Sequence, residues 1–283
     1  MTTEQLSSGE ILADAYAVRS ILARGGMGAV YAADDLELQR PVAIKTMRDG
    51  AVLRREARAL AQVHHTNVVA VHRVGAHRDV TFMVMERLYG TPLSEHIAAR
   101  RQRSRGFELD DALAILCGIA DGLTALHRAG IAHLDLKPAN VILCAGGRVV
   151  LVDLGIMVPE VIAGDRDPCG TPFYMAPELI DRALVPGRAC RADVYSFGAL
   201  AHELIAGDPP FPGTERAAVL ARHLVEPPPD LCAIRSDLPH RLGELVRACL
   251  SKLAADRPET AEELAWELRA IAARTSRPIR RPR

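Results

Sequence analysis

The chain has 283 residues, of which 49% are hydrophobic and 25% are charged, and these values are ordinary for a folded globular protein. Its length suits one large two-part domain or two smaller domains, and it can bury a full core without disulfides or metals as supports. Length and composition therefore exclude a disordered chain, a fibrous repeat and a small disulfide-rich scaffold.

The charges balance to zero, with 35 basic and 35 acidic residues, but they are unevenly spread. The last ten residues hold five Arg and no acidic residue. The rest of the chain is thus mildly acidic, so we expect no nucleic-acid partner. The six cysteines are scattered without a C-x-x-C pair, which is typical of a reduced, cytoplasmic protein. The sequence contains neither a signal peptide nor an apolar run long enough to span a bilayer, so we expect no membrane span.

The first ninety residues predict a small sheet with one helix. Residues alternate from Tyr16 onward, break at a glycine-rich turn and resume, which indicates two strands joined by that turn. The helix is predicted from the apolar spacing of Leu53, Ala57 and Leu60. The expected elements are strands from Tyr16 and over 29–31, 41–47, 68–74 and 81–85, and a helix over 51–63.

The sequence after residue 90 becomes helical. Its apolar residues recur with a helical period, and short strand-like pieces precede a loop rich in Pro and Gly. We expect helices over 110–129, 190–206, 214–224, 239–252 and 259–273, strands over 141–143 and 149–152, and a loop over 155–177. Trp266, the only Trp, is expected in the core of the last helix. The prediction is an α+β fold, a β-rich N-terminal lobe hinged to an α-rich C-terminal lobe, with a ligand cleft between the lobes.

The glycine-rich turn is the first candidate site. Gly25, Gly26 and Gly28 lie between two strands, which fits neither a dinucleotide-binding fingerprint nor a Walker phosphate loop. Glycines still allow backbone N–H groups to approach phosphates, although a plain hairpin turn explains them as well. Lys45 follows in the next strand, and Glu56 on the predicted helix could pair with it and hold its ammonium near the phosphates.

The strongest signal is the segment from His133 to Asn140, followed by Asp153. Asp135 can accept a hydroxyl proton, and Lys137 can neutralise a phosphoryl oxygen. Asn140 and Asp153 can hold Mg²⁺ through oxygen atoms. Phosphoryl transfer depends on this combination of positioning, metal and positive charge.

These motifs, in this order, resemble those of the eukaryotic-like (Hanks-type) bacterial serine/threonine protein kinases. The resemblance covers about residues 12–272 and implies a two-lobed protein-kinase fold, with an N-lobe at about 12–86 and a C-lobe at about 89–272. Residues 1–11 would be a polar tail and 273–283 a basic tail. The matching segments are the glycine turn, Val42-Ala43-Ile44-Lys45, Glu56, residues 133–140, Asp153-Leu154-Gly155, residues 170–174, Ala176-Pro177-Glu178, residues 193–198 and Asp256-Arg257-Pro258.

The resemblance implies ATP and Mg²⁺, or Mn²⁺ as an alternative, and a protein substrate with a Ser or Thr acceptor. Asp135 would be the catalytic base, and Lys45 would contact the α- and β-phosphates while pairing with Glu56. Asn140 and Asp153 would bind the metal. Three further groups would support the site: Lys137 as the serine/threonine-type marker, Thr171 as a brace of the catalytic loop, and Asp193 as an acceptor for the backbone of that loop.

The resemblance also implies the residues around the nucleotide. Met85 would be the gatekeeper, and Glu86 and Leu88 would offer backbone hydrogen bonds to adenine. Glu178 and Arg257 would form a buried structural ion pair. The residues expected to line the nucleotide site are Leu22, Ala23, Gly25, Gly26, Gly28, Val30, Ala43, Lys45, Met85, Glu86, Leu88 and Ile142.

Four departures from the family pattern affect the expectations. Ala23 stands where a glycine is usual, which predicts at most a weaker affinity for ATP. Only ten residues separate Lys45 from Glu56, which puts the first turn of the helix in doubt. Leu134 replaces the Arg that would pair with a phosphorylated loop, and residues 155–170 contain no Ser, Thr or Tyr. We therefore expect a non-RD kinase whose activity does not depend on activation-loop phosphorylation.

Two alternatives of other classes stay open. A pseudokinase would bind ATP as a scaffold and transfer nothing, but the expected catalytic residues are all present. A small-molecule phosphotransferase of the aminoglycoside type shares the lobes, but the segment from Gly170 to Glu178 argues against it. The sequence does not identify the protein substrate or the oligomeric state.

Overall fold

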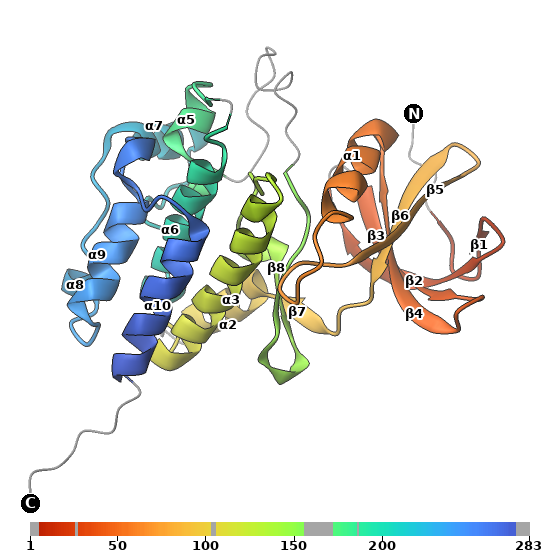
Figure 1. Ribbon diagram of the computed structural model, residues 1–283, viewed down its shortest axis with the longest axis horizontal. Helices are drawn as coiled ribbons and strands as arrows, with labels where there is room; N and C mark the ends of the chain where they lie inside the picture. Colours follow the sequence, from red (N-terminus) through yellow and green to blue (C-terminus); the bar gives the residue numbers. More distant parts are fainter. Residues whose placement is uncertain (1–5, 26–27, 103–105, 156–171, 186, 276–283) are drawn as a thin grey trace, which may run out of the picture. The chain divides into compact units, whose positions relative to one another are not determined.

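The computed structural model describes residues 6–25, 28–102, 106–155, 172–185 and 187–275 (Figure 1). The chain divides into two compact units, Met1–Gly90 and Thr91–Arg283. The first unit combines a sheet with one helix and the second is mainly helical, as the kinase resemblance implies.

The N-terminal unit is an antiparallel sheet with the strand order β1-β2-β3-β4-β6-β5. Its strands are β1 (Ile11–Leu12), β2 (Tyr16–Arg24), β3 (Gly28–Asp35), β4 (Arg40–Met47), β5 (Val71–His77) and β6 (Val80–Glu86). One core of this unit contains Ile44 and Phe82, both fully buried, and Leu6 from the segment before β1. Helix α1 (Gly50–Leu60) packs against β4, β5 and β6. Because side chains alternate along a strand, Lys45 points to the face opposite Ile44.

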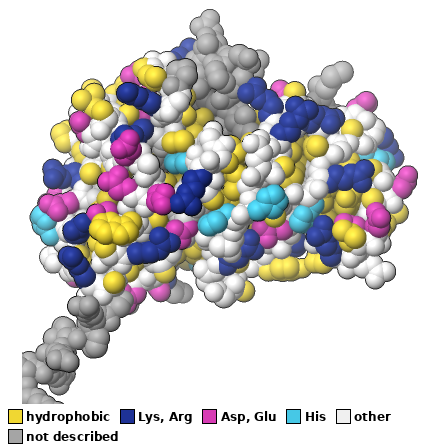
Figure 2. All heavy atoms as spheres, in the orientation of Figure 1, with side chains coloured by type: hydrophobic (Ala, Val, Ile, Leu, Met, Phe, Trp, Pro, Cys, Tyr) yellow, Lys and Arg dark blue, Asp and Glu magenta, His cyan; other side chains and the backbone are white. Residues whose placement is uncertain are grey.

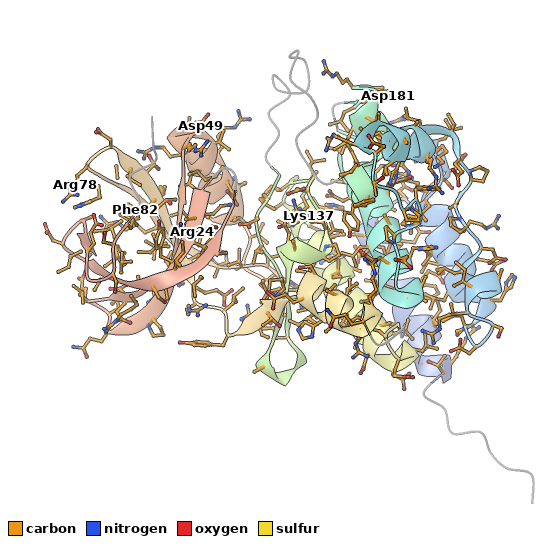
Figure 3. The ribbon with its side chains drawn as sticks, turned by 180° about the vertical axis from the view of Figure 1, so that it is seen from behind. Arg24, Asp49, Arg78, Phe82, Lys137 and Asp181 are labelled. Carbon is orange, nitrogen blue, oxygen red and sulfur yellow. The ribbon has the colours of Figure 1, made fainter. Side chains whose placement is uncertain are left out.

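Helix α1 begins directly after β4, which resolves the doubt about its first turn. The carboxylate of Asp49 caps the helix by accepting hydrogen bonds from the N–H groups of Ala51 at 2.9 Å and Val52 at 3.2 Å (Figure 3). Gly50 is required at the next position, because a Cβ atom there would lie 2.4 Å from Oγ1 of Thr81. The short connection is therefore built from a cap and a close approach to β6.

Two predictions for this unit need correction. The strand expected over 68–74 is β5, which begins three residues later, at Val71. Val68 and Val69 are both 1% exposed, but they follow a turn in which the N–H of Val68 donates to the carbonyl of His65 at 3.1 Å. Their apolar character reflects burial in the core and not membership of a strand. The helix expected over 51–63 ends earlier, at Leu60.

The C-terminal unit contains helices and a small sheet with the order β7-β8-β9. Helix α6 is buried on every side from Ala192 to Ile205, and it ends at Gly207, whose φ of 91° is left-handed. The elements are β7 (Gly90–Pro92), α2 (Leu93–Arg101), α3 (Leu109–Arg128), β8 (Val141–Cys144), β9 (Val149–Leu151), α5 (Pro177–Ile180), α6 (Cys190–Ala206), α7 (Arg216–Val225), α8 (Leu231–Ile234), α9 (His240–Cys249) and α10 (Ala261–Thr275). Short 3₁₀ turns lie at Pro138–Asn140, Ala145–Gly147, Pro172–Tyr174 and Ala254–Asp256.

The sequence missed some features of this unit. It did not predict α2, whose buried side chains are only Leu93 and Ile97, too few to show a period. The expectation for Trp266 is wrong, because its side chain is 63% exposed. The buried face of α10 is instead filled by smaller residues such as Leu264 and Leu268. Among the residues that the structure describes, no helix combines the length and apolar character that a membrane span requires.

The cap of α1 leads to a stability prediction. We expect Asp49→Ala to lower the free energy of unfolding by about 1 kcal/mol, because two N–H groups of the first turn lose their acceptor. Asp49→Asn keeps an acceptor oxygen and serves as the control. Urea unfolding followed by circular dichroism measures the difference, and equal midpoints for the Ala and Asn variants would contradict the role of the cap.

Candidate active site

The N-terminal unit holds a buried ion pair between β4 and α1. Nζ of Lys45 lies 2.7 Å from each carboxylate oxygen of Glu56. The side chain of Lys45 is 12% exposed and that of Glu56 is 2% exposed. Ion pairs this deeply buried need good geometry to compensate for lost hydration, and here both carboxylate oxygens are engaged. The pair fixes the Lys45 ammonium on the face of the sheet that α1 covers.

The glycine turn contains two glycines with different structural reasons. A Cβ atom at Gly28 would lie 1.9 Å from the backbone oxygen of Thr46, so only glycine fits where β3 passes β4. A Cβ atom at Gly25 would meet nothing closer than 3.9 Å, so packing does not require glycine there. Gly25 instead leaves an open backbone, with its N–H bonded to the carbonyl of Gly28 at 2.9 Å. Gly26 lies outside the described residues.

The residue before these glycines does not strain the turn. Ala23 lies within the extended strand β2, opposite Val30 on β3. The expected cost of Ala at a left-handed backbone position therefore does not arise, because a strand residue needs no positive φ.

The residues expected around the adenine ring lie along β2, β3, β4 and β6. Ala43 and Met85 face each other in register on β4 and β6, and they are 4% and 7% exposed. Val30 is half-buried, whereas Leu22 is 38% exposed. Ile142, the remaining member of the expected set, is half-buried on β8 of the other unit. Each unit thus contributes apolar side chains of the kind that line a nucleotide base.

Beyond Met85, the chain leaves β6 through Glu86 and Leu88. The carboxylate of Glu86 accepts a hydrogen bond from the N–H of Ala70 at 2.9 Å, and the N–H of Glu86 donates to the carbonyl of Ala70 at the same distance. The side chain of Glu86 is thus part of the internal structure of this unit. Hydrogen bonds to a base from this segment would come from backbone groups, as expected.

The C-terminal unit gathers the remaining polar candidates on two loops. Nζ of Lys137 lies 2.7 Å from Oδ2 of Asp135, and Nδ2 of Asn140 lies 3.0 Å from the same oxygen (Figure 3). Nδ2 of Asn140 also donates to the backbone oxygen of Asp135 at 2.9 Å and to that of Asp153 at 3.4 Å. Asn140 therefore links the loop that carries Asp135 to the loop that carries Asp153.

This arrangement suits a divalent cation held partly by a substrate. Because Nδ2 of Asn140 points to Asp135 and Asp153, its Oδ1 is the atom left for a cation. Asp153 adds a carboxylate, and Mg²⁺ is typically bound by one or two such oxygen donors together with substrate phosphates. Within the described ranges no cluster of three or more His, Cys, Asp or Glu residues could hold a metal. Asn140 and Asp153 thus fit a metal whose coordination phosphates complete.

A fully buried carboxylate, that of Asp193 on α6, holds the backbone of the Asp135 loop. Asp193 accepts hydrogen bonds from the N–H groups of His133 and Leu134, each at 2.7 Å, which confirms the bonds expected of it. Leu134 has a left-handed φ of 59°, a conformation that costs a non-glycine residue free energy. Asp193 thus compensates for a strained backbone one residue before Asp135.

His127, at the end of α3, completes this support. Its Nε2 lies 2.7 Å from Oδ2 of Asp193. Burial alone would lower the pKa of His127, but the hydrogen bond to Asp193, together with Cys190, outweighs burial and raises the pKa to about 9. His127 is therefore protonated at neutral pH and neutralises the buried carboxylate. Burial lowers the pKa of His133, which stays neutral beside this pair.

The loop that carries Asp153 approaches the loop of Asp135 closely. Asp153 has a left-handed φ of 57°, and the N–H of Gly155 donates to the carbonyl of His133 at 2.8 Å. A Cβ atom at Gly155 would lie 2.6 Å from Cβ of Asp135. Glycine at position 155 therefore sets the spacing between the two loops.

A second set of contacts anchors the segment that follows the undescribed residues 156–171. The hydroxyl of Ser196 on α6 donates to the backbone oxygen of Tyr174 at 2.7 Å, and the hydroxyl of Tyr174 donates to the carboxylate of Glu203. The guanidinium of Arg257, fully buried, pairs with both carboxylate oxygens of Glu178 at 2.6 and 2.8 Å, as expected. Thr171 lies outside the described residues.

Sequence reasoning missed His127 and the spacing role of Gly155. His127 stands in the last turn of the helix predicted over 110–129, six residues before His133. A histidine in that place is also a common helix-end residue, so only the fold shows that it reaches Asp193. Gly155 was included in a motif, but the sequence cannot show which backbone its missing side chain would strike.

Comparison with known proteins gives consistent matches. A family model described as the protein kinase domain matches residues 16–267. Serine/threonine-protein kinase PknL of Mycobacterium tuberculosis is 33% identical over 274 residues, covering 93% of this chain and 67% of PknL. A probable serine/threonine-protein kinase PknB of Lactococcus lactis is 31% identical over 268 residues, covering 90% of this chain and 42% of the relative. The crystal structure of the M. tuberculosis PknI kinase domain matches with a TM-score of 0.73 and 29% identity, covering 95% of this chain and 99% of that one.

The buried pair of His127 and Asp193 predicts a pH-dependent stability. Folding raises the pKa of His127 from 6.5 to about 9. The stabilisation is therefore fully present below pH 6.5 and is lost as the pH rises through about 9, an effect on the order of 3 kcal/mol.

The His127→Gln variant isolates this effect, because Gln keeps a donor for Asp193 but does not titrate. We expect the wild-type protein to be more stable than the variant at pH 6 and to lose this advantage by pH 10, as measured by urea unfolding at several pH values. A difference that stays constant over this range would show that His127 is not charged in the folded protein.

Proposed function

We propose that this chain, which belongs to the protein kinase family, transfers the γ-phosphoryl group of ATP to Ser and Thr hydroxyls of protein substrates through the residues described above. The family and its relatives identify it as a bacterial Hanks-type serine/threonine protein kinase, and the family uses ATP with a divalent metal. The observation that carries the site assignment is the carboxylate of Asp135, held by Lys137 and Asn140 on one loop. The assignment of roles to individual residues is our proposal.

In this proposal Asp135 accepts the proton of the attacking hydroxyl. Its carboxylate is 31% exposed, so a substrate can reach it, whereas the backbone behind it is fixed by Asp193. Lys137, 2.7 Å away, neutralises the charge that develops on the transferred phosphoryl group. Lys45, oriented by Glu56, binds the α- and β-phosphates, and the open backbone at Gly25 lies against them.

Asn140 and Asp153 are the proposed metal ligands. Both offer hard oxygen atoms, which favour Mg²⁺, with Mn²⁺ as an alternative. The bound cation would supply positive charge that neutralises the phosphate oxygens. Asn140 keeps this position because its amide nitrogen is bonded to Asp135, so the proposed metal ligand and the proposed base are fixed by the same side chain.

We further propose that the kinase is of the non-RD type and does not require phosphorylation of its activation loop. Leu134 carries no charge that could bind a phosphate, and residues 155–170 contain no Ser, Thr or Tyr. The loop of Asp135 is ordered by Asp193 and His127, both internal to the fold. These contacts form without any phosphate group, which supports activity in the unphosphorylated state.

The remaining proposals concern the chain as a whole. We propose a kinase domain at 12–272 between a polar segment and a basic one, and protein substrates without a nucleic-acid partner. Figure 2 shows Lys and Arg side chains interspersed with Asp and Glu over the visible face, and not gathered into one continuous basic surface. The cysteines that the structure describes are free thiols, which suits a reducing, cytoplasmic compartment.

Transfer of labelled phosphate from Mg-ATP to a general protein substrate tests the proposed base. We expect label on Ser and Thr with the wild-type chain and a loss of at least about 100-fold with Asp135→Asn, because the amide cannot accept the proton. Arg73→Ala, an exposed change on β5, is the control. ATP binding without transfer by the wild-type chain would indicate a scaffold, and transfer only to a sugar or drug would indicate a small-molecule phosphotransferase.

Phosphatase treatment tests the independence from the activation loop. We expect the treated kinase to retain most of its initial rate, since no acceptor residue lies in 155–170. Phosphosites are mapped by mass spectrometry before and after treatment. A large fall in rate that returns when one site is phosphorylated again would contradict this part of the proposal.

A further inference from the structure

The segment between β6 and β7 contains a side chain that folds back onto its own backbone. Nη1 of Arg87 donates a hydrogen bond to the backbone oxygen of Leu88 at 2.8 Å. The guanidinium carbon of Arg87 lies 5.2 Å from the centre of the Tyr89 ring, a cation–π distance. Arg87 is half-buried and Tyr89 is 62% exposed, so these contacts lie at the edge of the N-terminal unit.

From this contact we infer that Arg87 determines which purine base the kinase accepts, by withdrawing the Leu88 carbonyl from base recognition. The inference rests on the proposed function, in which the backbone of Leu88 contacts the base. It adds a specificity-determining residue to that site. Arg87 acts through Leu88, so its role is one of positioning.

The argument starts from the hydrogen-bonding groups of Leu88, which has one backbone donor and one backbone acceptor. Arg87 places a permanent positive charge against the acceptor. One lone pair of the carbonyl stays geometrically available, but a second N–H donor that approached it would meet the partial positive charges of the guanidinium hydrogens. The donor of Leu88 is unaffected, so this residue offers a base chiefly an N–H group.

The bases differ in what they need from such a site. The Watson–Crick edge of adenine carries an amino donor at C6 and an acceptor at N1. A purine with an amino group at C2 has one more donor beside N1, and that donor needs a further acceptor. With the Leu88 carbonyl occupied, the C2 amino group would lose its hydrogen bonds to water without replacement, which costs binding free energy. The arrangement therefore favours adenine over 2-aminopurine bases.

Tyr89 has a supporting part in this arrangement. Its ring lies beside the guanidinium and limits the orientations that Arg87 adopts. Among the described residues no carboxylate forms a printed salt bridge with Arg87, so the carbonyl and the ring are the contacts that hold it. Removal of the ring should free Arg87 partly, whereas removal of only the hydroxyl should not.

Affinities for Mg-ATP and for Mg-2-aminoadenosine triphosphate, which differ only in the C2 amino group, test the inference. We would measure both dissociation constants by titration calorimetry, without a protein substrate. For the wild-type chain we expect ATP to bind more tightly. For Arg87→Ala we expect the ratio of the two constants to shift by about fivefold toward the 2-amino nucleotide, since its extra donor gains an acceptor.

Three variants serve as controls. Tyr89→Phe should keep the wild-type ratio, Tyr89→Leu should shift it in the direction of Arg87→Ala, and Arg73→Ala should leave it unchanged. If Arg87→Ala weakened both nucleotides by the same factor, Arg87 would only stabilise the segment and the inference would be overturned. If the wild-type chain bound neither nucleotide, the proposed function itself would fail, an outcome that does not depend on Arg87.

Discussion

The carboxylate of Asp193 is the interaction on which the catalytic part of this molecule depends. It is fully buried, and two backbone N–H groups and one histidine surround it. A buried charge costs several kcal/mol unless it is paired and hydrogen-bonded, and here both conditions are met. Because the two N–H groups belong to His133 and Leu134, the proposed base begins on a backbone that the core of the C-terminal unit already fixes. The left-handed Leu134 shows that this backbone is not one that the local sequence would choose.

The N-terminal unit solves a comparable problem with a different device. Lys45 and Glu56 neutralise each other on the face of the sheet under α1, and both oxygens of Glu56 are engaged. In both units a charge needed for phosphate chemistry is positioned by a partner of opposite sign that substrate does not have to touch. Orientation is therefore established during folding, and the binding of nucleotide does not have to supply it.

The sequence predicted those parts of the structure that depend on motifs with fixed spacing. The order of strands and helices, the pairing of Lys45 with Glu56 and the bonds of Asp193 could all be inferred, because each follows from residue types at defined distances along the chain. Trp266 and β5 were wrong or shifted for a shared reason. An apolar residue indicates burial only when its neighbours leave room for it, and Val68 is buried in a turn while Trp266 faces solvent. The contacts of His127 and Gly155 join segments far apart in sequence, and a single sequence does not contain such distances.

The short connection from β4 to α1 has a consequence for motion. Three residues link Met47 to the start of the helix, and they span at most about 10 Å. Asp49 caps the helix and Gly50 is pressed against Thr81, so α1 has no slack in which to rotate as a rigid body. Separation of Glu56 from Lys45 would thus proceed by local unfolding of the first helical turn. A state without the ion pair would be reached through fraying, and its population would rise steeply with temperature.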